Sequence, residues 1–467
     1  MAFPVDLRHC QALGLAGTTF LTLGGGTAGA LPVRELWAPA SAHAALGLVG
    51  VYFGIVLLTA AWLLTGRLVR GPRPPTPRAL LLVLALWAAP LLLAPPLFSR
   101  DVYSYLAQGA MADAHMDVYA HGPDRLGGPL ADEVAPMWRH TAAPYGPAFV
   151  ALAAALSGLT DGRVPAGLLG MRLVALAGVA LMAVALPRLA RHNGADPAAA
   201  LWLGALNPLV LLHLVAGAHN DALMLGLLGL GLVAAHGRRP AAGAVGAVLV
   251  ALAALVKVPA ALGLPVVVAL RVRSGDRPLP AVLTTAAASA ATTVAATAVA
   301  GTGYGWLGAL GTPVSPGNWA LTSLLGRATG ALLARLGSGL APLAVPAWHL
   351  LGLAAAAVAV LLTARRLRAR PVYALGLSLL AVAVLGPAIR PWYALWGLFL
   401  VAAAAPGTPV RHRAAVLAGV LALAVLPSGG PADAGQLVLA VSGGALGVVV
   451  LWQARLAAQA PVPGRPA

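Results

Sequence analysis

The chain has 467 residues, of which 60% are hydrophobic and only 9% are charged, and its mean hydropathy is +0.86. Soluble domains are about one quarter charged, so this composition excludes an ordinary soluble protein. Apolar runs near the roughly 20 residues needed to cross a bilayer recur from one end of the chain to the other. We therefore predict an all-α, polytopic membrane protein in which residues 1–467 form a single membrane domain.

The formal net charge is +17, yet the arginines stand in short clusters between the apolar runs and not on one basic face. Clusters of this kind are typical of topology determinants in membrane proteins. We expect anionic membrane lipids to be the partners of these charges, each contributing about 1 kcal/mol near the surface, and we expect no nucleic acid. The lone cysteine, Cys10, excludes an internal disulfide and a cysteine-based metal cluster.

Counting the apolar runs between polar breaks predicts about fourteen membrane-spanning helices. Their expected ranges are 12–31, 44–66, 79–98, 168–187, 198–217, 221–236, 241–256, 258–271, 279–300, 343–363, 371–388, 392–407, 412–427 and 435–453. The two pieces on either side of Lys257 are short enough to form one bent helix or a re-entrant pair. Two further stretches, 149–159 and 321–336, would upset the alternation of loops if they crossed, so we expect them to be helices at the outer surface.

The placement of arginine predicts the orientation, because cytoplasmic loops carry the excess of basic residues. One side collects the basic residues of 8, 67–78, 188–191, 238–239, 271–277, 365–370 and 411–413. We expect this side, with both termini, to be cytoplasmic. The other side carries a long loop at 99–165 and a second loop at 301–340, and six of the 13 acidic residues lie between Asp101 and Glu133. We therefore expect the functional face to be the extracytoplasmic face of the plasma membrane.

The first candidate site is the run from Ser99 to Tyr105, where the third predicted span leaves the membrane. Arg100 and Asp101 are costly against lipid, so they should face a watery cavity or each other. A carboxylate at this boundary suits a general base whose pKa is tuned by burial. An exposed helix cap or an Arg–Asp surface pair is the structural alternative.

The rest of the 99–165 loop interleaves acids and histidines with aromatic residues. This mixture suits carbohydrate, because acids bind sugar hydroxyls and aromatic rings pack on sugar C–H faces. A loop of this length is usually functional. A divalent-metal site is the alternative, but no HExxH or comparable spacing is present, so we expect no metal site.

Two further candidates lie near predicted span ends. His219, Asn220 and Asp221 precede an apolar run, where Asp221 could simply cap a helix or could join Asp101 on the same side. Lys257, the only lysine of the chain, stands before Pro259 in an apolar segment. Snorkelling to the interface explains it as well as binding of a lipid phosphate does.

The last candidate joins the segments SPGNW, at 315–319, and RPWY, at 390–393. Trp392 and Tyr393 are ordinary residues for a membrane interface. Arg390 is a lone cation on the side that should be poor in cations, and phosphate binding would explain it. Asn318 on the neighbouring loop is taken as a further substrate-binding candidate.

The motifs RDVYSY, DVYAHGP, APYGP, GAHNDALM, VKVPA, SPGNWA and RPWYALW together resemble the actinobacterial polyprenol-phosphate-mannose-dependent α-1,6-mannosyltransferases, of the GT-C superfamily. The likeness covers roughly residues 79–400. It implies a helical membrane enzyme with a lipid-monophosphate sugar donor and an extracytoplasmic active site. Its acceptor would be a mannan or a lipid-anchored mannoside, and no cofactor or metal would be required.

The resemblance also implies residue roles. Asp101 matches the catalytic base, which would deprotonate the acceptor hydroxyl while polyprenyl phosphate leaves, with inversion. Lys257 and Arg390 would stabilise the leaving phosphate. The remaining substrate-binding candidates are Arg100, Tyr103, Tyr105, His219, Asn220, Asp221, Asn318, Trp392 and Tyr393. Ala114-His115-Met116-Asp117-Val118-Tyr119 stands where the family pattern is Gly-Leu-Asp-Pro-Tyr, which puts the acceptor specificity in question.

Three other functions remain open from the sequence. A transporter or lipid flippase would also use many spans and intramembrane charges, but such proteins often show two related halves, and these outer loops are strongly unequal. A related transferase for arabinofuranose or another lipid-phosphate sugar would share the phosphate machinery. A structural membrane protein would leave the gathering of acids, aromatics and solitary cations on one side unexplained.

Overall fold

The computed structural model describes residues 6–30, 43–239, 241–311, 318–430 and 432–457. Within these ranges the regular elements are helices, with no strand, which confirms the all-α prediction. The longer helices are α1 (Leu7–Ala28), α2 (Ala44–Val69), α3 (Pro77–Leu91), α4 (Asp101–Asp113), α7 (Pro147–Leu159), α8 (Val164–His192), α10 (Asp221–Ala235), α11 (Ala242–Val256), α12 (Gly263–Arg273), α13 (Pro278–Ala300), α14 (Leu321–Arg335), α15 (Ala344–Arg366), α16 (Pro371–Leu385), α17 (Ala394–Ala404), α18 (Thr408–Leu421) and α19 (Ala434–Ala457).

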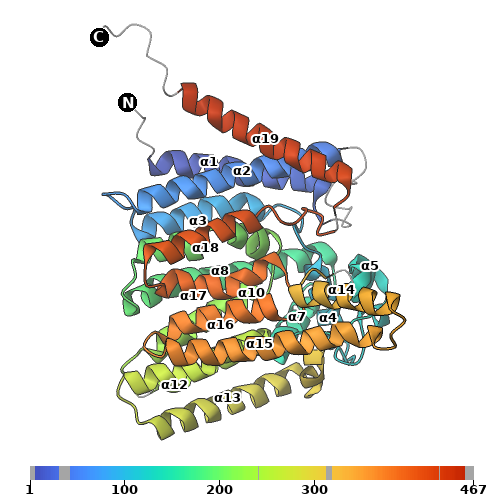
Figure 1. Ribbon diagram of the computed structural model, residues 1–467, viewed down its shortest axis with the longest axis vertical. Helices are drawn as coiled ribbons and strands as arrows, with labels where there is room; N and C mark the ends of the chain where they lie inside the picture. The colour runs from blue at the N-terminus through green and yellow to red at the C-terminus, as the bar shows by residue number, and fades with distance from the viewer. Residues whose placement is uncertain (1–5, 31–42, 240, 312–317, 431, 458–467) are drawn as a thin grey trace.

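Short helices connect these elements. They are η1 (Pro123–Arg125), α5 (Gly128–Glu133), α6 (Pro136–Arg139), α9 (Pro197–Gly204), the π-helix η2 (Val210–Ala216), η3 (Val258–Leu262), η4 (Gly305–Gly311), η5 (Ala341–Leu343) and η6 (Pro391–Tyr393). Most of the long helices lie side by side, while α4, α5, α7 and α14 gather at one end of the molecule (Figure 1). This end contains the loops that the sequence predicts to be extracytoplasmic.

A helical segment occupies each of the fourteen predicted ranges, and α7 and α14 occupy the two stretches expected at the surface. In the described part of the chain, five helices are long and apolar enough to cross a membrane. A sixth is added if η2 and α10 are counted as one bent span. The chain is therefore a helical membrane protein, and the count of about fourteen spans stays a prediction.

Local sequence explains where several helices begin. Proline occupies the first turn of α3, α7, α8, α9, α13 and α16, where its missing N–H costs nothing. The Thr76 hydroxyl accepts from the N–H of Ala79 and starts α3, and the Asp196 carboxylate accepts from Ala199 and starts α9. Gly178 lets α8 and α10 approach closely, because a Cβ there would lie 2.4 Å from the backbone of Ala222.

The single span expected at 198–217 is wrong in detail, because the chain breaks inside it. Pro208 has no N–H for an α-helical bond, and the side chain of Asn207 bonds to the carbonyl of Leu203 and the N–H of Val210. The chain then forms η2 and turns by 109° into α10. Residues 218–221 therefore lie at a buried bend, not at an exposed loop.

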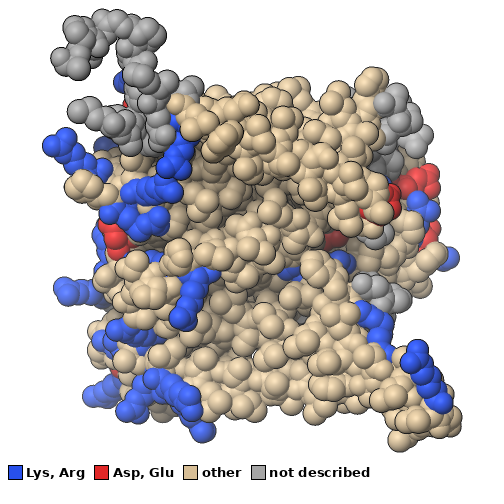
Figure 2. All heavy atoms as spheres, turned by 45° about the horizontal axis from the view of Figure 1, so that its top comes forward, with Lys and Arg blue, Asp and Glu red and all other residues tan. Residues whose placement is uncertain are grey.

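The basic side chains are unevenly distributed over the two ends of the molecule. Figure 2 shows most of the basic side chains at the end opposite α4 and α5, while acidic side chains gather chiefly beside these two helices. This separation matches the clusters seen in the sequence. The site described next lies at the end with the acidic residues.

Candidate active site

The first turn of α4 holds Asp101 at a defined position. The backbone N–H of Leu97 bonds to the carbonyl of Ala216, and that of Phe98 bonds to the carbonyl of Pro427. Phe98 has a φ of 67°, an uncommon conformation for a residue with a side chain, which these bonds sustain. The N–H of Asp101 then bonds to the hydroxyl of Ser99 at 3.1 Å. Two distant segments of the chain thus set where the carboxylate stands.

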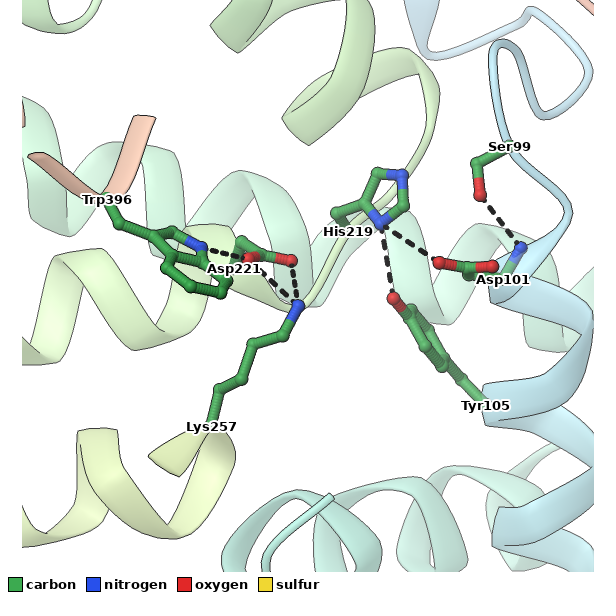
Figure 3. Close-up of polar contacts among 7 residues, drawn as sticks. All are labelled: Ser99, Asp101, Tyr105, His219, Asp221, Lys257 and Trp396. Carbon is green, nitrogen blue, oxygen red and sulfur yellow. Dashed lines mark hydrogen bonds and ion pairs between the residues drawn. The ribbon is translucent and has the colours of Figure 1, made fainter. Parts of the chain in front are cut away.

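The bend before α10 brings His219 to Asp101. Its Nδ1 atom lies 3.9 Å from Oδ2 of Asp101 and 3.2 Å from the hydroxyl of Tyr105, one turn further along α4 (Figure 3). The imidazole stacks on Trp392, with ring centroids 4.1 Å apart. The His219 side chain is fully buried, whereas 20% of the Asp101 side chain is exposed. His219 is therefore fixed by its neighbours, and Asp101 keeps access to a ligand.

Asp221 lies two residues further on in a closed environment. Its carboxylate accepts two hydrogen bonds from Nζ of Lys257, at 2.8 and 3.0 Å, and one from the indole N–H of Trp396, at 2.6 Å (Figure 3). The ammonium of Lys257 also lies 4.9 Å from the ring centre of Tyr393. A buried carboxylate with a paired cation and an indole donor is satisfied without a ligand.

The segment of Lys257 is extended and separates α11 from η3. Gly146, in the loop before α7, packs against the last turn of α11: a Cβ there would lie 2.2 Å from the carbonyl oxygen of Leu255. Only glycine permits this approach. The APYGP motif therefore ties the 99–165 loop to the segment that carries Lys257.

Asp101 lines two small cavities. One, of about 70 Å³, is also lined by Arg100, Arg390, Trp392 and Trp138. The other, of about 30 Å³, is lined by polar and aromatic side chains of α4 and the following loop: Ser104, Gln108, Trp138, Thr141 and Tyr145. The carboxylate thus has a cationic cavity and a hydroxyl-rich aromatic cavity as immediate neighbours.

Several buried polar atoms near these cavities have no hydrogen-bond partner among the described residues. They are Oγ of Ser104, Oε1 of Gln108, Nε1 of Trp392, Nε2 of His219 and both side-chain polar atoms of Asn220. Each unpaired buried group costs about 1–3 kcal/mol. Their gathering around one carboxylate is typical of a site that a polar ligand or ordered water completes.

The electrostatic balance at Asp101 has opposing causes. Burial raises the pKa of its carboxyl above the ordinary value, while the positive charges of Arg390 and Lys257 and the bond to Ser99 lower it. Burial prevails, so the pKa of Asp101 is raised. A carboxylate with a raised pKa is a stronger base than an exposed one.

The structure brings together most of the residues that the sequence singled out. Asp101, Arg100, Tyr105, His219, Asp221, Lys257, Arg390, Trp392 and Tyr393 belong to the two cavities or to the contacts behind them, and Asn220 is buried between His219 and Asp221 in the chain. Tyr103 differs, because its hydroxyl donates to the carbonyl of Ala30 at 2.8 Å. Residues 315–317 of the SPGNW segment lie outside the described residues.

Asn318 has a role that the sequence did not indicate. Its side-chain N–H donates to the carbonyl of Pro387, and its side-chain oxygen accepts from the N–H groups of Ala320 and Ile389. These bonds tie the start of α14 to the segment just before Arg390. Asn318 therefore positions the RPWY segment in this structure.

Ser104, Gln108, Trp138 and Tyr145 lie in the segments that the sequence singles out, but they are not among the predicted substrate-binding residues. A signal was present for the first two: a helix starting at Asp101 places positions 101, 104 and 108 on one face. Trp138 and Tyr145 depend on the fold of the loop, which has no periodic pattern. In the described part of the chain, no group of three or more His, Cys, Asp or Glu residues is arranged to hold a metal ion.

An all-α membrane protein with a carboxylate that lines both a cationic cavity and a cavity of polar and aromatic side chains has the features of a membrane glycosyltransferase. The family model described as alpha-(1->6)-mannopyranosyltransferase, N-terminal domain, matches residues 11–273, and the model described as MptB C-terminal domain matches residues 322–453. The chain belongs to the alpha-(1->6)-mannopyranosyltransferase family and is a mannosyltransferase.

Curated relatives cover most of the chain. Alpha-(1->6)-mannopyranosyltransferase A of Mycobacterium tuberculosis is 39% identical over 87% of this chain and 82% of its own length. A probable alpha-(1->6)-mannopyranosyltransferase of Mycolicibacterium smegmatis is 35% identical over 96% and 88%. Alpha-(1->6)-mannopyranosyltransferase B of Corynebacterium glutamicum is 32% identical over 86% and 72%. No solved structure matches the chain.

Proposed function

We propose that the chain transfers mannose from polyprenyl-phosphate-mannose to a growing α-1,6-mannan, with inversion and with Asp101 as general base. The observation that carries this proposal is that Asp101 lines both the cationic cavity and the polar aromatic cavity. A base in direct displacement must contact the acceptor hydroxyl while the leaving group lies on the opposite side of the anomeric carbon. Because Asp101 borders two different cavities, it would contact an acceptor in one while the donor phosphate occupies the other.

The bond changes of the proposed step are simple. Asp101 accepts the proton of the 6-hydroxyl of the acceptor while this oxygen forms a bond to the anomeric carbon of mannose. The bond between that carbon and the phosphate oxygen breaks, and polyprenyl phosphate leaves with the electron pair. A β-linked donor gives an α-linked product, because a single displacement inverts the anomeric carbon.

Arg390 is the residue best placed to stabilise the leaving phosphate. It lines the same cavity as Asp101, and its planar guanidinium can bind phosphate oxygens with two parallel hydrogen bonds. Arg100 lines this cavity and also a larger apolar cavity of about 350 Å³ between the ends of α1, α2 and α19, which suits a prenyl chain. Lys257 is already engaged by Asp221, so it supports the site through Asp221 and through its electrostatic field.

The second cavity is the proposed acceptor site. Its polar side chains, Ser104 and Gln108, have unpartnered atoms that can bond to sugar hydroxyls. Trp138 and Tyr145 offer aromatic faces for the C–H side of a sugar ring. We assign both cavities to the extracytoplasmic face, because the basic clusters lie at the opposite end of the molecule.

The experiment is mannose transfer from radiolabelled polyprenyl-phosphate-mannose to a short α-1,6-mannoside, in membranes with equal amounts of each variant. Asp101→Asn removes the base at almost constant size, and we expect transfer to fall by about 10²- to 10⁴-fold. Asp113→Asn is the matched control, because it changes an exposed aspartate at the other end of the same helix. We expect this control to transfer mannose like the wild type.

The other outcomes are equally informative. Equal transfer by Asp101→Asn and the wild type would remove Asp101 from the role of base. Transfer only from another lipid-phosphate sugar, such as an arabinofuranosyl donor, would change the donor and keep the machinery. Movement of the lipid donor across vesicles without any glycosyl transfer would favour a flippase.

A further inference from the structure

A further cavity lies at the basic end of the molecule, away from the site described above. It has a volume of about 590 Å³. Its lining residues lie at the ends of α8, α10, α12 and α17 and at the starts of α9, α16 and α18. No step of the proposed transfer uses it. Its size exceeds that of either cavity at Asp101.

Arginine dominates the charge of this cavity. Arg273, Arg370 and Arg411 line it, and the only carboxylate among its lining residues is Asp196. One oxygen of Asp196 already accepts a hydrogen bond from the N–H of Ala199 at 2.6 Å. The lining therefore keeps an excess of positive charge. His192 and His236 stack with ring centroids 4.3 Å apart, and they carry no negative charge that would offset this excess.

Hydrogen bonds within the protein do not occupy all the N–H donors of these arginines. Arg411 donates one hydrogen bond, from Nη2 to the carbonyl of Ala405 at 3.2 Å, while its buried Nε atom has no partner among the described residues. Arg273 and Arg370 are exposed and line the cavity. Guanidinium groups that converge on one recess bind phosphate oxygens through paired N–H donors.

The cavity is separated from the proposed catalytic site by the length of a helix. Asp221 begins α10 and contacts Lys257, whereas His236 follows the last residue of α10 and lines the basic cavity. The 15 residues of α10 span about 22 Å at 1.5 Å per residue. A ligand in the basic cavity is therefore distinct from the phosphate of a donor that reacts at Asp101.

We propose that this cavity is a binding site for a phosphate group, held by Arg273, Arg370 and Arg411 at the end of the protein opposite the catalytic site. The phosphate can belong to the headgroup of an anionic membrane lipid or to a free phosphate in solution, since both present the same oxygens to the arginines. Basic recesses between membrane helices commonly hold anionic headgroups. The site goes beyond the proposed function, because no residue of the transfer mechanism lines it.

The test uses the full-length protein in detergent with two probes. The first probe is phosphatidylglycerol compared with phosphatidylcholine, with binding followed by native mass spectrometry. The second is inorganic phosphate in the absence of added lipid, with binding followed by calorimetry. The test variant is Arg273→Gln/Arg370→Gln/Arg411→Gln, and the control is Arg365→Gln/Arg366→Gln/Arg368→Gln, which removes as many charges from the same end outside the cavity.

We expect the wild type and the control to bind phosphatidylglycerol in preference to phosphatidylcholine, and the test variant to bind it at least tenfold more weakly. The same dependence on the three arginines with inorganic phosphate would identify a free phosphate as a ligand. Arg163→Gln, which removes an exposed charge from the other end of the molecule, should leave this binding unchanged. The double variant Arg273→Gln/Arg370→Gln keeps the bond between Arg411 and Ala405 and replaces the triple variant if the latter does not fold.

Two results would overturn the proposal. One is equal binding of both probes by the test variant and the control. The other is the absence of any preference for phosphatidylglycerol, together with no binding of inorganic phosphate, by the wild type. The arginines would then serve only to set the orientation of the protein in the membrane.

Discussion

The starts of α4 and α10 carry the same residue and differ in their surroundings. Asp101 and Asp221 are each the first residue of a helix, where the helix dipole favours a carboxylate. The Asp101 side chain is 20% exposed and borders two cavities, and Nδ1 of His219 lies 3.9 Å from its carboxylate. Asp221 is fully buried and bonded to Lys257 and Trp396.

This difference separates a reactive carboxylate from a structural one. A base must exchange a proton with a ligand, so it needs an open side and a pKa adapted to its task. A carboxylate that closes an ion pair inside a helix bundle keeps its neighbours in place and, being fully buried, offers no surface to a substrate. The environment, and not the residue type or its position in the helix, assigns the two roles.

The largest expected effect concerns the contribution of the buried Asp221–Lys257 ion pair to the stability of the protein. Asp221→Asn leaves the ammonium of Lys257 buried without its carboxylate, which costs about 3–5 kcal/mol. We expect a marked fall in the melting temperature of the detergent-purified protein, followed by thermal unfolding. Asp101→Asn, at the partly exposed carboxylate, is the control and should not lower the melting temperature.

A second variant sharpens that prediction. Lys257→Met added to Asp221→Asn removes both charges and restores an apolar contact, so the double variant should be more stable than Asp221→Asn alone. Equal instability of the two would mean that Asp221 acts through Trp396 or through the backbone of α10. The ion pair would then not be the source of the difference between the two helix starts.

The next effect concerns Arg390, the cation that lines a cavity together with Asp101. Arg390→Gln removes a charge-assisted contact to the leaving phosphate, and such contacts contribute about 1.5–3 kcal/mol. We expect kcat/KM for mannosyl transfer to fall by roughly ten- to a hundredfold. Arg163→Gln, an exposed arginine at the same end of the molecule, is the matched control. A loss no larger than that of the control would exclude Arg390 from phosphate binding.

The pH dependence of transfer tests the electrostatics of Asp101 directly. As a base, Asp101 must be deprotonated, so kcat/KM should fall as the pH drops through its pKa. Burial raises this pKa above 3.8, and the charge of Arg390 opposes the rise. We therefore expect the acidic limb of the profile to lie above pH 3.8 and to move to higher pH in Arg390→Gln. An unchanged limb in that variant would mean that the limb does not report Asp101.

The same pKa determines how Asp101 affects stability. A carboxyl whose folded pKa is raised loses stability as the pH rises from 3.8 through the folded pKa, since burial disfavours the charged form. At neutral pH the ionised Asp101 therefore lowers the free energy of unfolding. For that reason we expect Asp101→Asn to hold or raise the melting temperature although it strongly reduces transfer.

The helices were largely predictable because apolar runs and proline positions mark them in the sequence. The interruption at Pro208 was overlooked, since the residues around it are as apolar as the rest of the predicted span. The number of crossings is harder to predict, because α16 and α17 are short and apolar and their composition alone does not define a span. Side-chain partners outside these helices decide where such segments lie.

The site was predictable only where polar residues interrupt apolar sequence. Asp101, His219 and Arg390 stand out for this reason, and the structure brings His219 and Arg390 to Asp101. The pairing of Asp221 with Lys257 joins residues 36 positions apart and depends on the packing of α10 against α11. Gln108 was not selected, because its role depends on the register of α4.

Substitution of Gln108 gives the smallest expected effect and tests the cavity proposed as the acceptor site. Its Oε1 atom is buried beside Asp101 without a partner among the described residues, so a bound sugar hydroxyl can donate to it. Gln108→Ala should therefore raise the KM for the mannoside acceptor by roughly two- to tenfold, as the loss of one neutral hydrogen bond predicts. The kcat and the KM for the lipid donor should change little. Gln11→Ala, at a distant glutamine of α1, is the control. A rise in the KM for the donor instead would exchange the roles of the two cavities, because Gln108 would then contact the transferred sugar and not the acceptor.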